Sequence, residues 1–524
     1  MANQLRFFKK NTIIRNSLLI FIFGFIIRSI PNLLTSYPIG YDTIDYATQI
    51  LNWEYELQFP NLFFQTPLFI LQADFIYLIT NVDPFVIIRF FQPLLFGFLI
   101  LSFYYASRQV CRWTPKWAFL GSIIFSMQTV TLRISWDLLR NEVGLSLLLL
   151  SLSHFKRPKS ATYIILTILI GFAHQIVSFI LLAIVTGLSL VHFWNRHYNK
   201  AKNLILSSIP FLLLFSLVLI YSLNQVDIGQ QATSQSIFSA TIISLPKEPS
   251  LPFPFINYLV GEGLADYQGS YFSLVLDVFT LYIASFLPLL PFLLHKVFYE
   301  PKLSHNVPLI PVNIWMIICT VPVINCLLIP SIAIFSWHRW MLMLVAPYTF
   351  YAVPQFAKLS SNHRLRGFRR IFLSLLVFVL GLSSLFYLIM PHTSPISSYA
   401  ALNPSSKYSP VTMMRNTLTL DDVPYLRNVF TWLMKTTDKS SCLLVKDAFV
   451  DWAKILILTN ITLINYRNQD VFDGIQYACA LSYTDVYWVW WDNGIGVQWY
   501  GQEVPNYFMP VYQSNTIVIY KYVS

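Results

Sequence analysis

Residues 17–49, SLLIFIFGFIIRSIPNLLTSYPIGYDTIDYATQ, run from an apolar segment directly into a polar loop. Asp42 and Asp45 lie among tyrosines in this loop, at the point where a membrane-spanning helix would leave the bilayer. An ordinary connecting loop needs only residues such as serine and glycine at such positions. The stretch therefore indicates either the start of a new helix, capped by a carboxylate, or part of a chemical site.

The composition of the whole chain is that of a membrane protein. It has 524 residues, of which 56% are hydrophobic and 11% are charged, whereas soluble domains carry about a quarter charged residues. The first apolar run is followed by many others, so we expect a membrane helix there and not a cleaved signal peptide. The runs predict about eleven transmembrane helices, at residues 17–30, 85–105, 117–130, 145–153, 163–172, 176–192, 204–223, 271–294, 312–329, 341–353 and 371–390.

The charge of +11 is distributed by loop, which predicts the orientation of the chain. Lysine and arginine cluster in every second connection, whereas the stretch between Arg28 and Arg89 contains neither but holds six acids. Basic loops face the cytoplasm. We therefore expect a plasma-membrane protein with a cytoplasmic N-terminus, an outer first loop at 31–84 and an extracytoplasmic C-terminal part. This distribution accounts for the charge without a nucleic-acid partner.

Two further segments complete the expected organisation. The short apolar stretch 66–80, interrupted by Asp74, is predicted to lie in the outer membrane interface. Residues 1–390 form the expected membrane domain, and 391–524 a small α/β domain, in which Cys442 and Cys479 are expected as free thiols, with a disulfide as the alternative. Its predicted helix is 420–437, and its predicted strands are 441–446, 455–466, 485–491 and, as a half-buried edge strand, 515–523.

Polar residues at the ends of the predicted spans gather on the outer side. They are Asp42 and Asp45, then Asp137, Arg140 and Asn141 in SWDLLRNEVG, His174 and Gln175 in GFAHQ, and His338 and Arg339 in SWHRWM. Ionisable groups beside membrane spans are costly and suggest function.

Each of these residues also has a structural interpretation. Asp42 is compatible with a helix cap, Asp137 with a pair to Arg140 on one helix, His174 with a hydrogen bond between helices, and Arg339 with an interface anchor. The gathering of acids, histidines and guanidinium groups on one side favours a site.

The layout resembles the GT-C superfamily of integral-membrane glycosyltransferases. The resemblance is carried by RSIPNLLTSYPIGYDTIDY, by TPLF and DPFVIIRF before the second span, and by SWDLLRNEVGL, FAHQ and WHRWMLMLVAPYTFYA. Members have a cytoplasmic N-terminus, an aspartate soon after the first span and, in several cases, an extracytoplasmic C-terminal domain. The resemblance implies a polytopic α-helical membrane protein of GT-C type with a small extracytoplasmic α/β domain.

The C-terminal part is also distantly similar to oligosaccharyltransferase catalytic subunits, through VFTWLMKTTDKSSCLLVKDAFVDWA. Those enzymes carry WWDYG after this strand, whereas this chain has Lys446–Asp447–Ala448 there and WWDNG only at residues 490–494. We therefore interpret Trp490 to Asp492 as strand packing and do not expect recognition of a peptide acceptor.

The resemblance implies transfer of a hexose or pentose from a polyprenyl (dolichyl-type) phosphate to a glycan, lipid or protein acceptor at the outer membrane surface. Asp42 would be the general base, with Asp45 as its substitute. The residues expected to hold the donor phosphate are Arg140, His174, His338 and Arg339. Asp137, Asn141 and Gln175 would support them, and Asp42 with Asp137 is the candidate site for a divalent cation such as Mg²⁺ or Mn²⁺.

Two other classes of function compete with sugar transfer. A lipid or solute transporter or flippase would show internal repeats and helices broken by Gly or Pro in corresponding positions, and the sequence shows no such symmetry. A sensor or scaffold with an outer domain would use Asp42 and Asp45 only as helix caps.

Overall fold

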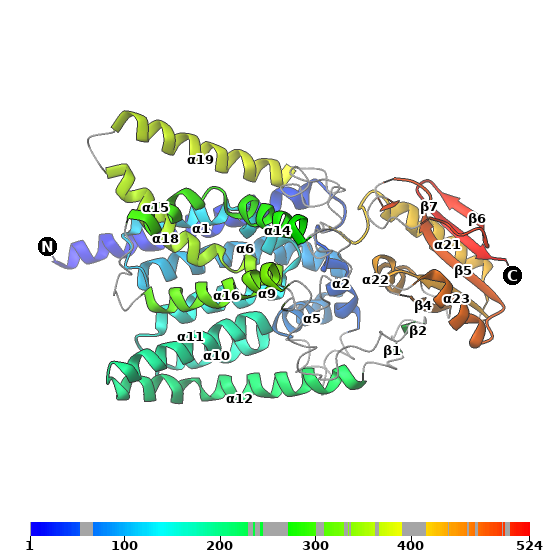
Figure 1. Ribbon diagram of the computed structural model, residues 1–524, viewed down its shortest axis with the longest axis horizontal. Helices are drawn as coiled ribbons and strands as arrows, with labels where there is room; N and C mark the ends of the chain where they lie inside the picture. Colours follow the sequence, from blue (N-terminus) through cyan, green and yellow to red (C-terminus); the bar gives the residue numbers. More distant parts are fainter. Residues whose placement is uncertain are drawn as a thin grey trace.

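Long apolar helices form most of the molecule in the computed structural model, and a sheet domain closes one end (Figure 1). The N-terminus lies at the opposite end from the C-terminal domain (Figure 1). The structure describes residues 2–52, 67–228, 234–235, 241–244, 271–299, 309–329, 334, 337–361, 366–389, 416–438, 440–457, 461–466, 470–494, 496–497 and 503–523.

The helices of the first three quarters of the chain follow the predicted apolar runs. Each of the eleven runs falls on one helix or on two consecutive helices. The helices are α1 (Ala2–Leu33), α2 (Thr43–Leu51), α5 (Leu68–Thr80), α6 (Pro84–Gln109), α7 (Pro115–Ser126), α8 (Thr129–Asp137), α9 (Leu139–His154), α10 (Ala161–Ala173), α11 (Gln175–Trp194), α12 (Tyr198–Ile228), α14 (Tyr271–Phe286), α15 (Leu290–Tyr299), α16 (Ile310–Leu328), α17 (Trp337–Leu342), α18 (Val345–Ser361) and α19 (Arg366–Ile389).

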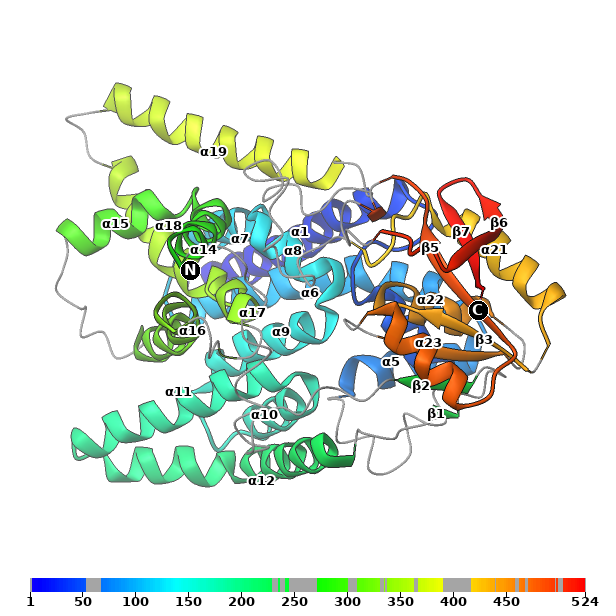
Figure 2. The ribbon, with the colours of Figure 1, turned by 45° about the vertical axis from the view of Figure 1, so that its right-hand side comes forward.

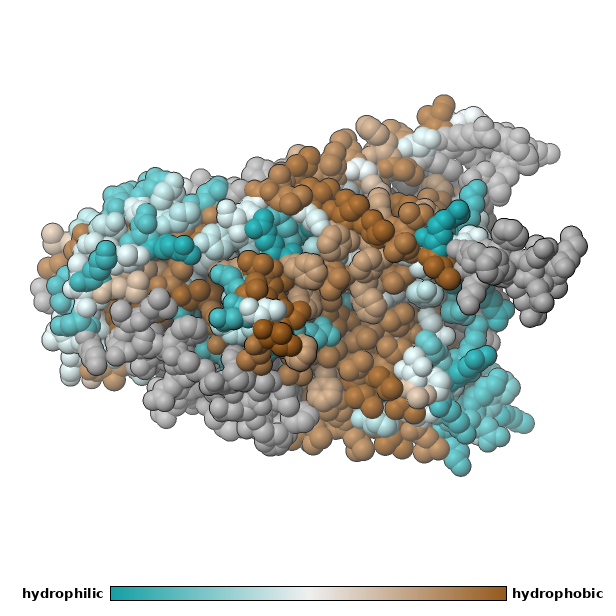
Figure 3. Space-filling view, turned by 180° about the vertical axis from the view of Figure 1, so that it is seen from behind, coloured by the Kyte–Doolittle hydropathy of each residue, from teal (hydrophilic) through white to brown (hydrophobic). Residues whose placement is uncertain are grey.

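Several of these helices can cross a bilayer by themselves. Five have the length and apolar composition of a span among the described residues, in α1, α6, α11, α12 and α16, and the bent pair α7–α8 makes a sixth. Figure 3 shows hydrophobic side chains across the middle of one face of the molecule, with hydrophilic residues toward both ends. The chain is therefore a multi-pass membrane protein, as the composition predicted.

Close backbone contact joins the first two long helices. A Cβ atom on Gly24 of α1 would lie 3.1 Å from the Cα atom of Gly97 on α6. Small residues at such a crossing let two membrane helices approach closely. This contact fixes α1 against α6 and so positions the loop that carries Asp42.

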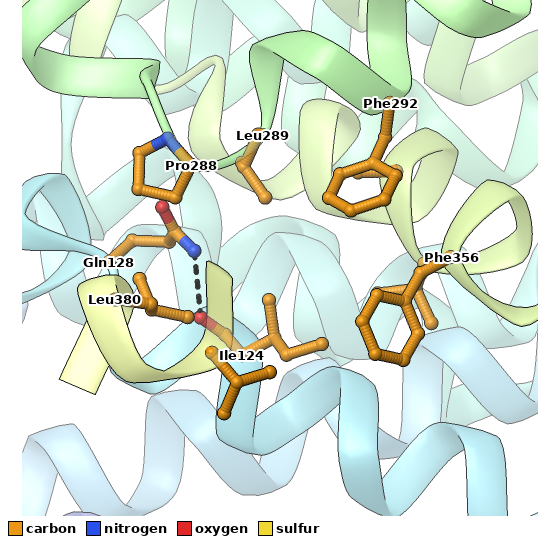
Figure 4. Close-up of a pocket in the computed structure, with 10 residues that line it drawn as sticks. Ile124, Gln128, Pro288, Leu289, Phe292, Phe356 and Leu380 are labelled. Atoms are coloured by element: carbon orange, nitrogen blue, oxygen red, sulfur yellow. Dashed lines mark hydrogen bonds between the residues drawn. The ribbon is translucent and has the colours of Figure 1, made fainter. Parts of the chain in front are cut away.

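The break between α7 and α8 turns the chain by 64°. The Gln128 side chain lies at this break and donates from Nε2 to the Ile124 carbonyl oxygen at 3.0 Å (Figure 4). A cavity of about 20 Å³ beside it is lined mainly by apolar residues that include Pro288, Leu289 and Leu380 (Figure 4). Such a volume is enough for about one water molecule. The bend directs α8 toward the end of the bundle where Asp42 lies.

The predicted interfacial segment forms α5, a short apolar helix. It packs against α2 and α6, and Figure 1 shows it beside α2 at the end of the bundle that bears the sheet domain, the end at which Figure 2 also shows it. Asp74 is buried in this contact.

The sheet of the C-terminal part has the order β1-β2-β4-β3-β5-β7-β6. Helix α21 packs against β6 and β7, whereas α22 and α23 pack against β3 and β4. The elements are β1 (Ser234–Gln235), β2 (Thr241–Ser244), α21 (Val423–Thr436), β3 (Ser441–Val445), α22 (Asp447–Leu456), β4 (Thr462–Asn465), α23 (Val471–Ala480), β5 (Asp485–Trp491), β6 (Phe508–Ser514) and β7 (Ile517–Tyr522).

The predicted helix and strands lie in these elements, with two corrections. The segment 455–466 is not one strand, because its first two residues end α22, and among its described residues only Thr462–Asn465 pairs in the sheet. Strand β7 is not an edge strand, because β6 covers it on the side away from β5. The predicted packing role is confirmed for Trp490 and Trp491, which are buried in β5, but it is wrong for Asp492, which is exposed just after the strand. Cys442 and Cys479 are free thiols.

Two strands of the sheet, β1 and β2, come from the preceding part of the chain. Strand β2 follows α12 in sequence and pairs in parallel with β4, with Ile243 opposite Ile464. The domain boundary near residue 390 stays a prediction. The sheet assigned to the C-terminal domain contains strands from both sides of this boundary.

Candidate functional site

The carboxylate of Asp42 lies at the end of the bundle, where the polar loop begins α2. Asp42 precedes this helix, and its carbonyl oxygen accepts from the Tyr46 backbone N–H at 3.0 Å. Its side chain makes no capping hydrogen bond. Instead, Oδ2 accepts from Nη2 of Arg339 in α17 at 3.1 Å, and 20% of the Asp42 side chain and 19% of the Arg339 side chain are exposed. The Asp42 carboxylate therefore does not cap α2, and the helix-cap interpretation does not explain why an aspartate is at this position.

Asp45 belongs to a second polar group on the same helix. Its Oδ2 atom accepts from Nε2 of Gln49 at 2.8 Å, one turn along α2. The Oε1 atom of Gln49 in turn accepts from Nη2 of Arg140. The Arg140 guanidinium carbon also lies 5.3 Å from the centre of the buried Tyr46 ring, close enough for a cation–π contact. Gln49, which the sequence analysis did not select, thus connects Asp45 to Arg140.

The segment around Arg140 differs from the helix that was expected. Asp137 ends α8, and a break at Leu138 separates it from Arg140 in the first turn of α9. The two residues are therefore not spaced along one helix, as the pairing hypothesis required. The side chain of Asp137 lies outside the described residues. Asn141, predicted as a supporting residue, is buried in α9.

His174 occupies the single-residue joint between α10 and α11. Its Nδ1 atom accepts from the Ile176 backbone N–H at 3.1 Å, so the ring caps α11 and does not simply bridge two helices. A neutral imidazole that accepts at Nδ1 carries its proton at Nε2. Arg140 and Arg339 both lie near enough to act electrostatically on this ring. His174 therefore offers an N–H donor close to both guanidinium groups, and Gln175 follows it as the first residue of α11.

His338 precedes Arg339 at the start of α17 and is buried, because only 7% of the residue is exposed. The positive charges of Arg339 and of Arg133 act on it. Arg133 is a fully buried residue of α8. It lies between the predicted span 117–130 and the polar segment that begins at Ser135, so the sequence did not mark it as a site residue. The structure thus brings a third arginine close to the predicted phosphate-binding residues.

A buried polar network holds the ends of α1, α8 and α9 beneath this site. The Arg28 side chain donates from Nε to the Ser135 carbonyl oxygen and from Nη1 to Oδ1 of Asn32, each at 3.1 Å. The carboxylate of Glu142 in α9 interacts electrostatically with Arg28. Both charged residues are fully buried. These contacts join α1 to the helices that carry Arg133 and Arg140, although neither carboxyl oxygen of Glu142 has a hydrogen-bond partner among the described residues.

The C-terminal domain covers the same end of the bundle. The Trp452 ring of α22 stacks on Phe85 at 5.9 Å and meets Tyr37 edge-on at 5.7 Å between ring centres. The backbone N–H of Gly40 donates to Oδ1 of Asn416 at 3.1 Å. Gly40 has a φ of 143°, which only glycine adopts readily. These contacts seat the domain on the loop that leads into Asp42.

Helix α22 also brings an ion pair to the site. Nζ of Lys454 lies 2.7 Å from Oδ1 of Asp451, and both charges act on Asp45 across the contact between α22 and α2. Burial and the nearby Asp451 carboxylate together raise the pKa of Asp45 to about 6, against a smaller opposing effect of Arg140. Asp45 therefore titrates closer to neutral pH than an ordinary aspartate.

The predicted metal site is not tested by these contacts. Within the described ranges, no three His, Cys, Asp or Glu side chains are grouped as metal ligands. A cation between Asp42 and Asp137 stays a prediction, because the Asp137 side chain is outside those ranges. What the described residues do offer is a carboxylate, two arginines and a histidine N–H at one accessible end of a membrane bundle.

Comparison with known proteins identifies the fold. The chain is similar in structure to ArnT from Cupriavidus metallidurans, crystallised with undecaprenyl phosphate, with a TM-score of 0.51 and 10% sequence identity over 97% of this chain and 98% of that chain. No protein-family model and no curated protein matches the sequence. ArnT is a GT-C glycosyltransferase, so the GT-C fold expected from the motifs is confirmed.

Proposed function

We propose that this protein transfers a sugar from a polyprenyl phosphate to an acceptor at the end of the bundle where Asp42 pairs with Arg339. The observation that carries the proposal is this pair, 3.1 Å apart, with Arg140 and His174 close by. These residues combine a proton acceptor with hydrogen-bond donors for a phosphate. They lie at the end of apolar helices against which a lipid tail can pack. The undecaprenyl phosphate bound to ArnT, which has the same fold, supports a lipid-phosphate donor.

The guanidinium groups are the first requirement of the mechanism, because a sugar phosphate leaves as an anion. Arg339 and Arg140 can bind phosphate oxygens through charge-assisted hydrogen bonds, and arginine suits a bidentate contact. The Nε2–H group of His174 adds a neutral donor. His338 is buried beside Arg339, and in this proposal it orients the guanidinium and contributes a further donor.

The pair between Asp42 and Arg339 would open when the donor binds. The pair is one hydrogen bond between charged groups, and each bond of this kind contributes about 1.5–3 kcal/mol. A phosphate that makes two such bonds can therefore displace the carboxylate. Donor binding then frees Asp42 to accept a proton.

The transfer step follows from these two roles. The acceptor oxygen forms a bond to the anomeric carbon while the bond from that carbon to the phosphate oxygen breaks. Asp42 takes the proton of the acceptor hydroxyl, and the polyprenyl phosphate leaves with the bonding electron pair, held by the arginines. Asp45 and Gln49 hold Arg140 in place. Asp137, Asn141 and Gln175 are assigned supporting roles next to these residues, and the need for Mg²⁺ or Mn²⁺ stays open to test by chelation.

We assign the site to the outer face of the plasma membrane, where nucleotide sugars are absent and lipid-linked donors serve. The basic loops gather at the other end of α6, where Nζ of Lys156 donates to the Gln109 carbonyl oxygen at 3.3 Å. Such loops face the cytoplasm. A cysteine introduced next to Asp42 should react with an impermeant reagent in intact cells, and one next to Lys156 should not. The reverse pattern would contradict the assignment.

Asp45 should set the acidic limb of the pH–rate profile. As the pH falls below about 6, Asp45 takes up a proton, and the neutral carboxyl loses its charge-assisted bond to Gln49 and its hold on Arg140. We expect the wild-type rate to fall through this range. Asp45→Asn should be slower at neutral pH and show no inflection near pH 6. Asp83→Asn, which keeps an exposed helix cap in the same loop, should retain the wild-type profile. An unchanged inflection in Asp45→Asn would contradict this role.

Profiling of lipid-linked and envelope glycans, with and without the gene, tests the proposed function as a whole. We expect one hexose or pentose to disappear from a single acceptor and its polyprenyl-phosphate form to accumulate. The wild-type gene should restore the sugar, and a gene carrying Asp42→Asn should not. Identical glycans in the two strains would refute the proposed function. If a sugar is missing, its identity gives the donor sugar and the glycan that lacks it gives the acceptor.

A further inference from the structure

A groove lies between α1 and α7, near the end of α1 that is remote from Asp42. Its volume is about 640 Å³, within the roughly 300–1,000 Å³ of small-molecule sites. Its lining includes Arg15, Asn16 and Leu19 of α1 and Thr114, Lys116 and Phe119 at the start of α7. The 18 residues between Arg15 and Leu33 span roughly 27 Å of helix. The groove is therefore separate from the proposed transfer site.

Two cations face this groove without a carboxylate to balance them. In the part of the chain that the structure describes, neither Arg15 nor Lys116 forms an ion pair with an acid. The two side chains come from different helices and line the same groove, whereas isolated surface cations point into open solvent. Two such charges at one concave place favour an anion.

Neutral donors surround the two charges. The Thr114 hydroxyl oxygen accepts from the Trp117 backbone N–H at 3.5 Å as the cap of α7. Its own hydrogen therefore remains available to a ligand. The Asn16 amide also interacts with the Tyr104 side chain, and the second N–H of this amide adds a further donor on the α1 side. The set of guanidinium, ammonium, hydroxyl and amide groups matches the oxygens of a phosphate diester.

The apolar side of the groove indicates that the anion belongs to a lipid. Leu19 is 48% exposed, and Phe119 is half-buried next to it. Leu19 continues into the exposed apolar face of α1, at Leu18, Ile22 and Ile26. This part of α1 has the length and composition of a membrane span, so the groove opens onto acyl chains. A free phosphate would have no use for these contacts.

We propose that this groove binds the headgroup of one anionic glycerophospholipid. Arg15 and Lys116 hold the phosphate, Asn16 and Thr114 donate to phosphate or glycerol oxygens, and Leu19 and Phe119 pack against the first methylenes of an acyl chain. The bound lipid joins the N-terminal half of α1 to α7 and so stabilises the bundle. This binding is independent of sugar transfer.

The test uses the full chain purified in mild detergent and titrated with phosphatidylglycerol or phosphatidylcholine of the same acyl chains. Native mass spectrometry counts the retained lipids, and a thermal scan follows unfolding. We expect retention of phosphatidylglycerol over phosphatidylcholine and a rise in Tm with the former. The double variant Arg15→Gln, Lys116→Gln should bind phosphatidylglycerol at least about tenfold more weakly, with transfer activity unchanged.

Matched variants control for charge and folding. Arg157→Gln with Lys159→Gln removes the same two charge types from an exposed loop and should retain the lipid. The exchange Arg15→Lys, Lys116→Arg keeps both charges and should restore most of the binding. Equal retention of phosphatidylglycerol by the Gln double variant, equal retention of phosphatidylcholine by the wild type, or the same rise in Tm from inorganic phosphate alone would each overturn the proposal.

Discussion

Asp42→Asn should lower the rate of sugar transfer by about 10²–10⁴-fold, the usual effect of losing a general base. The amide keeps the shape of the side chain but cannot accept the acceptor proton. The structure sharpens this experiment, because the Asp42 side chain makes no capping bond to α2 and the substitution removes no helix cap. The measurement is single-turnover transfer from a polyprenyl-phosphate sugar, together with a thermal scan.

Its control is Asp45→Asn, three residues along the same helix. If Asp42 is the base, Asp45→Asn should leave appreciable activity and alter mainly the pH profile. A dead Asp45→Asn with an active Asp42→Asn would move the base to Asp45. If both variants remain fully active with their folds intact, the two carboxylates are structural and the proposed chemistry is wrong.

Arg339→Ala should weaken donor binding and transfer by at least about tenfold, since one hydrogen bond to a charged group contributes about 1.5–3 kcal/mol. Unlike the loss of a base, the loss of a phosphate ligand should affect binding of the donor lipid itself. Arg339→Lys keeps the charge but not the bidentate geometry, so its donor binding should lie between that of the wild type and that of Arg339→Ala. Donor binding by each variant is measured by titration in detergent or nanodiscs.

Arg427→Ala is the matched control for Arg339→Ala. Arg427 lies on α21 at the same end of the molecule, where Nη2 donates to the Tyr37 hydroxyl oxygen at 3.2 Å. Its loss removes a guanidinium that contacts the loop before Asp42 but is remote from the proposed phosphate site. We expect near-normal donor binding. Normal donor binding by Arg339→Ala would remove this residue from the site.

The apolar runs predicted the helices because membrane helices must bury their backbone polar groups internally and present apolar side chains to lipid. The gathering of Asp42, Arg140, His174 and Arg339 at one end of the bundle could likewise be expected from loop alternation. Their contacts could not. Asp42 and Arg339 are 297 residues apart, and nothing in either local pattern specifies which acid meets which arginine.

Other features were invisible for particular physical reasons. Gln49 is neutral and lies in an ordinary helical pattern, so its bond to Arg140 depends wholly on how α2 packs. Arg28 lies within an apolar run and Arg133 just beyond the end of one, and nothing in the local sequence of either residue indicates that it is buried. Strand β2 joins the sheet from far upstream by backbone hydrogen bonds, which leave little trace in side-chain periodicity.

The most direct test of the central claim is native mass spectrometry of the full chain purified from its own membranes. The account predicts that the wild-type protein carries one polyprenyl phosphate or its sugar-bearing form, that Asp42→Asn retains it, and that Arg339→Ala loses it. A transporter of another solute would carry none. Wild-type protein without any polyprenyl phosphate, or Arg339→Ala protein that carries as much as the wild type, would contradict the account.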